Sequence, residues 1–523
     1  MEEIGSTFGE ALAYHAARQP DALALHFGGN TTDYATLDRR STQIANALLA
    51  MGAAEDCRVA YIGKNSDIAI ELVLGVAKAG MVFVPITWRL TAAEIEAVLR
   101  DCEPAALFVE PDFADRIPQD VQGMSLVVLM GETGGDPSWP RFTPWRDAAS
   151  AAPAPVAVAA DDVVLQLYTS GTTGKPKGVM LSHANATSIR NLLRTANLPW
   201  LFPTEPEAVL VAMPYGHIAG VGGVLFAVLD GAEMVVHPEF DAGAILAAIE
   251  THRIKRLFLV PAALRMLLDH PRAAVTDFSS LDYFFYGSSP IPLGLLQQGL
   301  EALKCGFIQL YGLTETWGSA VALPPEDHHP DRLRVMASAG RVVPGVEIRI
   351  VDETGAPLPS GMIGEILIRS PSNMKGYWNR PEDTAHALPP GGWLRTGDAG
   401  LLDAEGYLFI QDRIKDMIIT GAENVYPAEV ESAIHGHADV ADVAVIGVPD
   451  DKWGEAVKAI VVLKAGRIPN PASVIAFART RVAGYKCPKS VDFTESLPRN
   501  PAGKILRRTL REPYWAGRER RVN

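Results

Sequence analysis

The segment with the clearest chemistry is a loop rich in glycine, hydroxyl and lysine side chains. It reads Tyr168-Thr169-Ser170-Gly171-Thr172-Thr173-Gly174-Lys175-Pro176-Lys177-Gly178-Val179. Glycines let the backbone approach an anion closely, while exposed N–H groups and hydroxyls donate to it and lysines supply positive charge. The segment therefore predicts a phosphate-binding loop. The residues expected to contact phosphate are Thr169, Ser170, Gly171, Thr172, Thr173, Gly174, Lys175 and Lys177.

Two other interpretations of this loop are weaker. A Walker A loop has the pattern Gly-x-x-x-x-Gly-Lys-[Ser/Thr]. Here Gly171 and Gly174 are too close together, and Pro176 follows Lys175, so the hydroxyl that would hold magnesium is missing. A plain turn would not need two lysines among its glycines. We therefore interpret this segment as a phosphate-binding loop that is not a Walker A loop.

The elements around the loop alternate as in an α/β protein. Residues 163–168 form an apolar run that predicts a buried strand leading into the loop. Helical and extended patterns alternate over residues 1–130 and again after residue 208, which favours parallel strands joined by helices. Residues 134–162 are rich in Pro, Ala and Gly and predict a surface connection. The expected strands are 58–62, 82–85, 208–213 and 257–260, and the expected helices are 41–51, 68–79 and 242–251.

The pattern changes towards the C-terminus. From about residue 339 the chain has short strands and tight turns, which predict a β-rich lobe. From about residue 415 to the end a small α+β unit is expected, with a helix near 428–435 and strands at 441–448 and 456–463. The predicted fold class is therefore α/β plus α+β. It has a large N-terminal domain of α/β sheet lobes with a β-rich lobe, and a small C-terminal α+β domain.

The size and charge of the chain narrow the classes of function. A chain of 523 residues is too long for one ordinary core, so two to four domains or lobes are expected. A formal net charge of −14 argues against nucleic acid as the main partner, because phosphate backbones need a basic surface. A nucleotide needs only a local positive pocket.

Compartment and assembly follow from simpler features. The four cysteines are scattered without metal-ligand spacing, which indicates free thiols in a reducing compartment. The N-terminus has no apolar signal region, and no apolar run approaches the ~20 residues of a membrane span. We expect a cytoplasmic protein with no integral membrane segment. Peripheral membrane association and the oligomeric state, a homodimer included, remain open.

Six further segments follow the loop in order, and with it they resemble the adenylate-forming superfamily of acyl-CoA synthetases, luciferases and peptide-synthetase adenylation domains. They are Tyr286-Gly287-Ser288-Ser289-Pro290, Tyr311-Gly312-Leu313-Thr314-Glu315-Thr316, Gly392-Trp393-Leu394-Arg395-Thr396-Gly397-Asp398, Asp412-Arg413-Ile414-Lys415-Asp416, Glu423-Asn424-Val425-Tyr426-Pro427 and Asn500-Pro501-Ala502-Gly503-Lys504. The resemblance covers essentially the whole chain. It implies an adenylation domain over residues 1–414 and a small mobile domain over residues 415–523.

The implied reaction is the activation of a carboxylate by ATP. Transfer of AMP to the carboxylate releases pyrophosphate and makes a mixed anhydride whose AMP leaves readily. A thiol then takes the acyl group and releases AMP. The first step must neutralise charge on the α-phosphate and on departing pyrophosphate, so we expect electrostatic preorganisation to contribute most.

The resemblance assigns roles to individual residues. Glu315 is implied to bind Mg²⁺ and Thr314 to contact the α-phosphate, although a Thr-Glu-Thr segment can also simply open a helix. Asp398 is implied to accept both ribose hydroxyls, assisted by Arg413. The implied adenine site consists of Gly287, Ser288, Ser289, Pro290, Tyr311 and Gly312, with Tyr311 stacking on the base.

Two lysines are implied to serve the two half-reactions. Lys504 follows a flexible turn and is implied to bridge the carboxylate and the α-phosphate during adenylation. A surface lysine in a basic tail is the alternative. Lys415 falls on the position about which the C-terminal domain of this superfamily rotates between half-reactions. The alternative there is a solvated lysine in a charged turn.

The acyl pocket carries a weaker signal. Residues 213–220 resemble the Pro-x-aromatic-His-x-x-Gly loop of the superfamily, in which His217 and Gly220 are implied to line the acyl and pantetheine tunnel. Gly216 stands where an aromatic residue is usual, which predicts a wider or looser wall. Trp317 is expected to narrow the pocket or to stack on a ring of the acid. Alanine at 422 replaces a usual glycine in a loop that borders the thiol channel.

The acceptor and the acid are separate questions. No carrier module follows the adenylation unit, and residues 484–488 resemble a segment close to the pantetheine arm, so coenzyme A is the favoured acceptor. A medium- or long-chain fatty acid and an arylpropenoic acid both fit. The alternatives within the superfamily are an enzyme that feeds a separate carrier protein and a luciferase-like oxygenase. Outside it, a P-loop NTPase switch would release ADP and phosphate.

Overall fold

The computed structural model describes residues 5–52, 54, 56–118, 124–170, 176–196, 198–201, 207–420, 423–499 and 504–516. Five residues predicted to bind phosphate lie outside these ranges: Gly171, Thr172, Thr173, Gly174 and Lys175. The alanine at 422 also lies outside them, as do the side chains of Ser170 and Lys415.

A seven-stranded sheet delivers the phosphate-binding loop. Neighbouring strands from β4 to β6 run parallel, as the alternation in the sequence predicts. β7 and β8 pair in antiparallel fashion, so residues 171–175 connect the two strands of a hairpin. The strand β8 was missing from the predicted elements. The spatial order is β18 (Gly376–Tyr377), β8 (Pro176–Ser182), β7 (Val163–Ser170), β4 (Val82–Thr87), β3 (Arg58–Gly63), β5 (Ala106–Val109) and β6 (Leu126–Leu129).

A nine-stranded sheet carries the adenine segment and the segment with Glu315. Its central strands are parallel, so the carboxyl ends of β12 and β13 meet at one edge, where ligands bind in open α/β sheets. The spatial order is β15 (Arg341–Val342), β14 (Val321–Leu323), β13 (Gly306–Tyr311), β12 (Tyr283–Gly287), β11 (Arg256–Leu259), β9 (Ala208–Val211), β10 (Glu233–Val236), β1 (Leu23–Phe27) and β2 (Asn30–Asp33).

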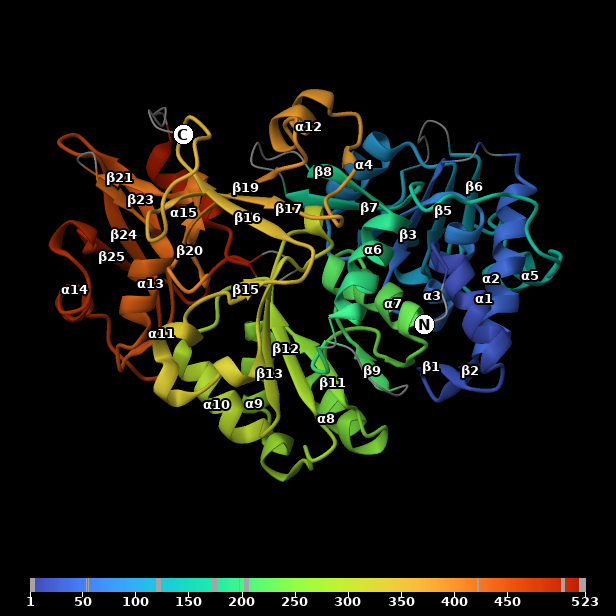
Figure 1. The fold of residues 1–523 in the computed structure, drawn as a ribbon, viewed down its shortest axis with the longest axis horizontal. Coiled ribbons are helices and arrows are strands. Elements are labelled where there is room, and N and C mark those ends of the chain that lie inside the picture. The colour runs from blue at the N-terminus through green and yellow to red at the C-terminus, as the bar shows by residue number, and fades with distance from the viewer. Residues whose placement is uncertain are drawn as a thin grey trace.

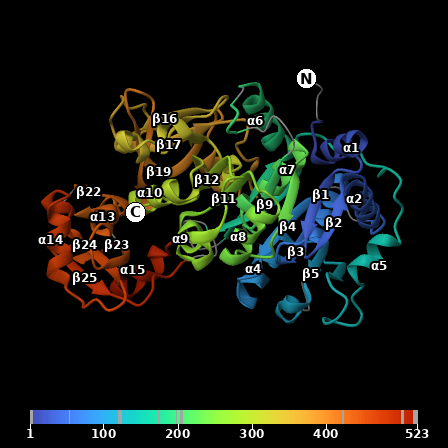
Figure 2. The ribbon, with the colours of Figure 1, turned by 90° about the horizontal axis from the view of Figure 1, so that it is seen from below.

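Helices fill the space between these two sheets and cover their outer faces (Figures 1 and 2). The buried cluster between the sheets joins side chains of both to α1 (Phe8–Arg18), α2 (Tyr34–Leu49), α3 (Asp67–Lys78) and α7 (Ile218–Asp230). α4 (Ala92–Cys102) covers the other face of the seven-stranded sheet. The outer face of the nine-stranded sheet is covered by α8 (Ala242–Thr251), α9 (Pro261–Asp269) and α10 (Leu293–Leu303).

Local sequence explains where several of these helices begin. Thr7 accepts from the backbone of Glu10, whose side chain reaches back, so α1 opens with a capping box. Thr91 and Glu94 do the same for α4. The shorter helices are α5 (Phe142–Asp147), α6 (His183–Thr195), α11 (Leu333–Met336) and α12 (Pro381–Ala387). α5 lies in the segment predicted to be only a surface connection, which corrects that expectation.

A four-stranded antiparallel sheet forms the β-rich lobe. Its strands are β16 (Glu347–Val351), β17 (Gly364–Arg369), β19 (Leu394–Leu402) and β20 (Leu408–Arg413). Asp398 on β19 is the register partner of Arg413 on β20. The sheet therefore places these two residues, distant in sequence, side by side.

The C-terminal unit is a small α+β domain at the left of Figure 1, as predicted. Its sheet consists of β22 (Glu423–Val425), β21 (Ile418–Thr420), β24 (Gly454–Leu463), β23 (Val440–Asp450) and β25 (Ser490–Phe493). One face packs on α13 (Pro427–His435) and α14 (Pro471–Arg479), the other on α15 (Arg507–Trp515). The predicted fold class is confirmed. No helix within the described ranges is long and apolar enough to cross a bilayer.

Candidate active site

The best-defined part of the site is a triad at the junction of the nine-stranded sheet and the β-rich lobe. The Tyr311 hydroxyl at the end of β13 donates to Oδ2 of Asp398 at 2.7 Å. Nε of Arg413 lies 2.7 Å from Oδ1 of the same carboxylate. The Asp398 backbone N–H donates to the Thr396 hydroxyl at 3.0 Å, which fixes the turn before it. The three predicted residues are therefore brought together.

Burial and neighbouring charges shift the pKa values of Tyr311 and Arg413 in this triad. Burial and the Asp398 carboxylate raise the pKa of Tyr311 well above its ordinary value, so the phenol remains a donor. Burial alone would lower the pKa of Arg413, but Asp398, together with Tyr311, Glu315 and Asp416, outweighs it and raises that pKa. Asp398 therefore faces two donors, the phenol and the guanidinium. Tyr311 was predicted to stack on adenine, and the structure adds the hydrogen bond of its hydroxyl to Asp398.

Close backbone contacts explain two of the glycines beside the triad. A Cβ at Gly287 would lie 2.5 Å from the carbonyl oxygen of Leu310 on the neighbouring strand. A Cβ at Gly312 would lie 2.5 Å from the backbone carbon of Gly318. Ser288 follows with φ +67°, which turns the chain sharply out of β12. The predicted adenine wall, Gly287 to Pro290, therefore projects from the carboxyl edge of the sheet.

Glu315 lies in a short 3-10 turn, η3 (Thr314–Thr316), beyond β13. The Tyr377 hydroxyl of β18 donates to Oε1 of Glu315 at 2.9 Å, and the Met374 N–H donates to the Glu315 carbonyl at 2.8 Å. The side chain is thus oriented by a strand of the other large sheet, and the helix-opening role considered for it is not what the structure shows. A half-buried carboxylate is a hard oxygen ligand that suits Mg²⁺.

Tyr377 was missed as a site residue by the sequence interpretation. Its segment, Lys375-Gly376-Tyr377-Trp378, offers only an aromatic pair after a glycine, and nothing there points to Glu315 sixty residues earlier. A second missed residue is Asp383 of α12, which accepts from Nζ of Lys177 at 2.6 Å. Lys177 is the register partner of Thr169, so the described end of the phosphate hairpin is tied to α12.

The C-terminal lysine lies in a short, pinned segment. Ile505 forms an antiparallel bridge with Arg499, and the Leu506 N–H donates to the Pro498 carbonyl at 2.8 Å. Lys504, next to that bridge, is half-buried. Three residues after Lys504, Arg507 pairs with Glu431 at 2.7 Å. This arrangement ties the segment around Lys504 to α13.

The predicted acyl pocket gathers around the start of α7. His217 caps α7, and its Nε2 atom is shielded from solvent without a hydrogen-bond partner among the described residues. Burial, reinforced by the positive charge of Arg89, lowers the pKa of His217 to about 4. A Cβ at Gly220 would lie 2.2 Å from the carbonyl oxygen of Pro214, so only glycine fits there. His217 is therefore a neutral ring near pH 7.

Gly216 does not widen the wall as predicted. A Cβ at this position would lie 2.8 Å from Cβ of Thr87 and 3.0 Å from its backbone nitrogen. Thr87 at the end of β4 lies in the space that a side chain at position 216 would need. The expectation of a looser wall at Gly216 is therefore corrected.

Trp317, which was predicted to narrow the pocket or stack on a ring of the acid, packs in the buried core with residues of α7. It is 2% exposed, and its indole stacks on Phe8 with ring centroids 6.0 Å apart and contacts Phe226 of α7 at 6.1 Å. Its φ of +54° is an uncommon conformation for a bulky residue and follows the turn of η3. A Cβ at Gly222 would lie 3.6 Å from the indole nitrogen. Trp317 thus lies directly over a glycine of α7.

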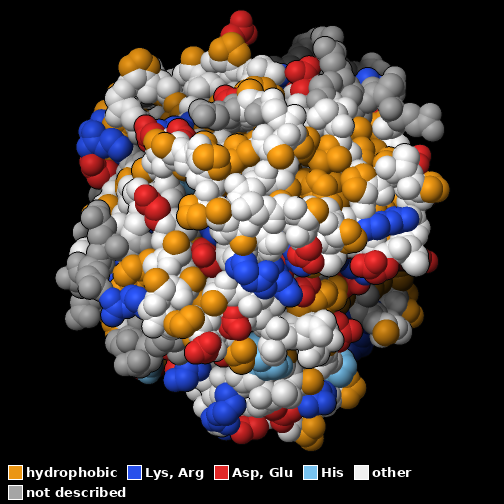
Figure 3. Space-filling model, turned by 90° about the vertical axis from the view of Figure 1, so that its right-hand side faces the viewer, with side chains coloured by type: hydrophobic (Ala, Val, Ile, Leu, Met, Phe, Trp, Pro, Cys, Tyr) orange, Lys and Arg blue, Asp and Glu red, His pale blue; other side chains and the backbone are white. Residues whose placement is uncertain are grey.

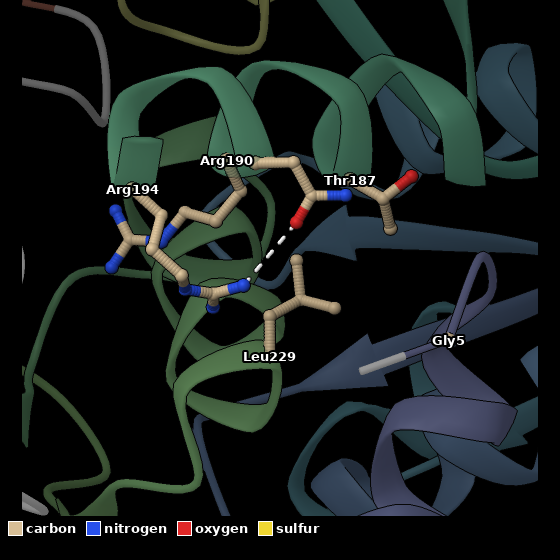
Figure 4. Close-up of a pocket in the computed structure, with 6 residues that line it drawn as sticks. Gly5, Thr187, Arg190, Arg194 and Leu229 are labelled. Carbon is tan, nitrogen blue, oxygen red and sulfur yellow. Dashed lines mark hydrogen bonds between the residues drawn. The ribbon is translucent and has the colours of Figure 1, made fainter. Parts of the chain in front are cut away.

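A separate hollow between α6 and α7 is not this pocket. Figure 4 shows this hollow, which is lined by Thr187, Arg190 and Arg194 of α6 and by Leu229 of α7. Its volume of about 10 Å³ suits one water molecule. Both arginines pair with the single carboxylate of Asp230.

Comparison with known proteins identifies the class. Residues 12–378 match the model of the AMP-binding enzyme family, and residues 429–504 match that of the AMP-binding enzyme C-terminal domain. The chain therefore belongs to the AMP-binding enzymes, and it is an AMP-forming acid–thiol ligase.

Particular relatives agree over nearly the whole length. The chain is 40% identical over 519 residues to the fatty acid–[acyl-carrier-protein] ligase ScoC of Streptomyces coeruleorubidus, covering 99% of this chain and 98% of that one. It is 39% identical over 504 residues to a feruloyl-CoA synthase of an Amycolatopsis species, covering 95% and 97%. The crystal structure of ATP-bound MatB from Rhodopseudomonas palustris superposes with a TM-score of 0.87 at 33% identity, covering 97% and 99%.

Proposed function

We propose that this enzyme activates an arylpropenoic acid with ATP and Mg²⁺ and transfers the acyl group to coenzyme A. The observation that carries the choice of acid is a set of buried polar atoms around the start of α7 that have no hydrogen-bond partner among the described residues. They are Oγ1 of Thr87, the hydroxyl of Tyr215, Nε2 of His217 and Nε1 of Trp317.

These atoms belong to adjoining segments. Gly216 contacts Thr87, and Gly222, on the second turn of the helix that His217 caps, contacts Trp317. A buried donor or acceptor without a partner costs about 1–3 kcal/mol. An acid with phenolic or methoxy oxygens on a ring offers such partners, and its ring can pack on the indole. An alkyl chain offers none, so the pocket favours the oxygenated aromatic acid. The feruloyl-CoA synthase relative supports the same choice.

A panel of acids tests this proposal through the rate of pyrophosphate release. Ferulate carries a ring with phenolic and methoxy oxygens, and cinnamate has the same ring without these oxygens. Octanoate has an alkyl chain and no ring. Ferulate is expected to exceed cinnamate in kcat/KM by about 10-fold or more, because cinnamate leaves the polar groups unpaired. Equal values for ferulate and cinnamate, or a higher value for octanoate, would contradict the proposal.

The variant Trp317→Phe should reduce this preference. It keeps the ring packed on Phe8 and Phe226 but removes the indole N–H, so we expect the ferulate-to-cinnamate ratio to fall about 3-fold or more. The matched control is Trp453→Phe, which changes a 44% exposed tryptophan of the C-terminal domain. An unchanged ratio in Trp317→Phe would show that the indole N–H does not face the acid.

A second candidate is a fatty acid ligase with an acyl carrier protein as acceptor, which the ScoC relative favours. AMP release in the presence of fatty acid should then depend on a phosphopantetheinylated carrier protein and ignore coenzyme A. The proposed coenzyme A ligase shows the opposite dependence.

We assign the ATP site by the triad and the segments around it. Asp398 would receive the ribose hydroxyls on the lone pairs that Tyr311 and Arg413 leave available. Glu315 would hold Mg²⁺, which supplies positive charge to the phosphate oxygens. Thr314 and the hairpin around Thr169 and Ser170 would contact the phosphates.

The variant Asp398→Asn is expected to raise the KM for ATP by about 10-fold or more. It loses the anion that Arg413 and Tyr311 hold in place, and a hydrogen bond to a charged group contributes about 1.5–3 kcal/mol. Steady-state kinetics at saturating acid measure the change. Glu353→Gln, an exposed carboxylate of the same lobe, serves as the control. A KM within 2-fold of the parent enzyme would contradict the placing of Asp398 at the ribose, because such a ratio corresponds to less than about 0.5 kcal/mol.

A further inference from the structure

A cluster of metal-ligand side chains lies apart from the active site. One ligand atom each of His26, Glu233 and His252 lies within 4.8 Å of the others. β1 and β10, which carry the first two, are separated from the adenine strands β12 and β13 by β9 and β11. The cluster therefore has no part in holding ATP.

The fold places the three side chains on one face of the nine-stranded sheet. Val235 of β10 packs in the cluster with α8, so Glu233, two residues earlier, lies on that same face. His26 is the register partner of Val235 on β1. His252 is the residue that ends α8. Two strands and a covering helix thus bring their ligands to one place.

The side chains of the cluster lie close enough to one another to share one ion. Nε2 of His26 lies 2.7 Å from Oε1 of Glu233, yet that nitrogen makes no hydrogen bond of acceptable geometry with any described residue. The rings of His26 and His252 lie 4.8 Å apart between centroids at an interplanar angle of 62°. Ligands about 2.0–2.2 Å from a shared metal ion are themselves roughly 3–4 Å apart, so small rotations of these side chains would complete the set.

We propose that His26, Glu233 and His252 form a binding site for a divalent transition metal ion of the zinc class, which fastens the β1–β10 part of the sheet to the end of α8. Two imidazoles and one carboxylate are a donor set that suits Zn²⁺, whereas Mg²⁺ prefers oxygen ligands alone. The site therefore differs in metal preference from the Mg²⁺ position proposed at Glu315.

The exposure of these side chains agrees with this assignment. The side chains of His26 and Glu233 are 19% and 33% exposed, which leaves a route for the ion and room for a water ligand. Histidine side chains reach the surface in the lower part of the face shown in Figure 3, among acidic and basic ones.

The plain alternative is an ion pair between a protonated His26 and Glu233, with His252 merely adjacent. That pair would hold without metal and would not distinguish Zn²⁺ from any other cation. The two interpretations therefore differ in what happens when metal is added to the stripped protein.

The experiment uses the full-length, untagged protein, stripped with chelator and kept free of ATP. Zn²⁺ is titrated against a chromophoric chelator in the presence of millimolar Mg²⁺, and Co²⁺ absorption reports coordination. We expect one equivalent of Zn²⁺ per chain, a visible Co²⁺ spectrum typical of nitrogen and oxygen ligands, and a higher thermal unfolding midpoint with Zn²⁺ than without.

Two variants and one control decide the assignment. His252→Ala and Glu233→Gln are each expected to weaken Zn²⁺ binding by at least about 10-fold and to abolish the rise in unfolding midpoint, since each removes one of three ligands. His329→Ala is the control, because His329 lies 3.5 Å from Asp331 on the surface and no third ligand joins them among the residues that the structure describes. Glu233→Gln preserves shape, so it tests the site even if the alanine variant folds poorly. Zn²⁺ binding that survives both variants, or a parent protein that binds no Zn²⁺, overturns the proposal.

Discussion

Replacing Lys504 by alanine is expected to slow formation of the acyl adenylate by about 100-fold or more, while thioester formation from supplied acyl adenylate and coenzyme A changes far less. The reason is the charge that develops when the carboxylate attacks the α-phosphate. Both reacting groups are anionic, and a lysine held between them is a preorganised donor of the kind whose removal costs about 10²–10³ in rate.

The segment that carries Lys504 is held in place by contacts within the C-terminal domain. Lys504 is half-buried beside the bridge between Arg499 and Ile505, and Arg507 is paired with Glu431, so the segment is positioned by its own domain. A lysine carried by a rigid domain can enter or leave the site as that domain moves. Such movement would confine its effect to one half-reaction.

Two assays separate the steps. Exchange of radiolabelled pyrophosphate into ATP measures adenylation, and single-turnover reaction of preformed acyl adenylate with coenzyme A measures thioester formation. Lys489→Ala, an exposed lysine of the same domain, provides the matched control and should leave both steps unchanged. Equal loss in both half-reactions for Lys504→Ala would assign the lysine to the integrity of the domain and not to adenylation.

The order of the elements could be predicted from the sequence where local periodicity is strong. The helix α8 has the bounds that its apolar spacing predicts, and the strand β3 differs by one residue. The packing of α7 between two sheets could not be predicted, because α7 is apolar on all sides and periodicity alone does not say which sheets cover it. β8 was not predicted because its first residues are polar and belong to the phosphate-binding loop.

The site residues differ in the same way. Some were predicted from local motifs, and others depend on contacts with distant parts of the chain. Asp398 and Arg413 were predicted from ordered motifs, and the β19–β20 register confirms that they are neighbours. Tyr377 was not predicted, because its contact with Glu315 joins two sheets and leaves no trace in local spacing. Gly216 was misjudged for a related reason: its effect depends on Thr87, which lies on another strand.

The change Lys415→Pro is expected to leave adenylate formation within about 2-fold of the parent and to reduce thioester formation by about 50-fold or more, on the reasoning that a locked hinge blocks the conformational step. The chain leaves the four-stranded sheet at Arg413 and enters the C-terminal sheet at Ile418. Between them lies a single 3-10 turn, η6 (Ile414–Asp416), with Lys415 at its centre. The whole connection between the two sheets is therefore this one short segment.

A proline at this position acts on the backbone in two ways. It fixes its own φ near −65°, which is compatible with the observed 3-10 turn, and it disfavours a helical conformation at the residue before it, Ile414. Rotation about the φ angle of residue 415 is thus prevented, which restricts the domains to one arrangement. If the two half-reactions need different domain arrangements, only one of them survives.

The matched control is Lys415→Ala, which removes the same side chain but leaves φ and ψ free. It should sustain both half-reactions, so a defect confined to the proline variant comes from the backbone. The measurement follows pyrophosphate release and coenzyme A thioester formation in the same single-turnover reaction, in which Lys415→Pro should accumulate enzyme-bound acyl adenylate. Normal thioester formation in the proline variant would place the pivot elsewhere, while loss of adenylation in Lys415→Pro but not in Lys415→Ala would show that adenylation is the step that requires the rotation.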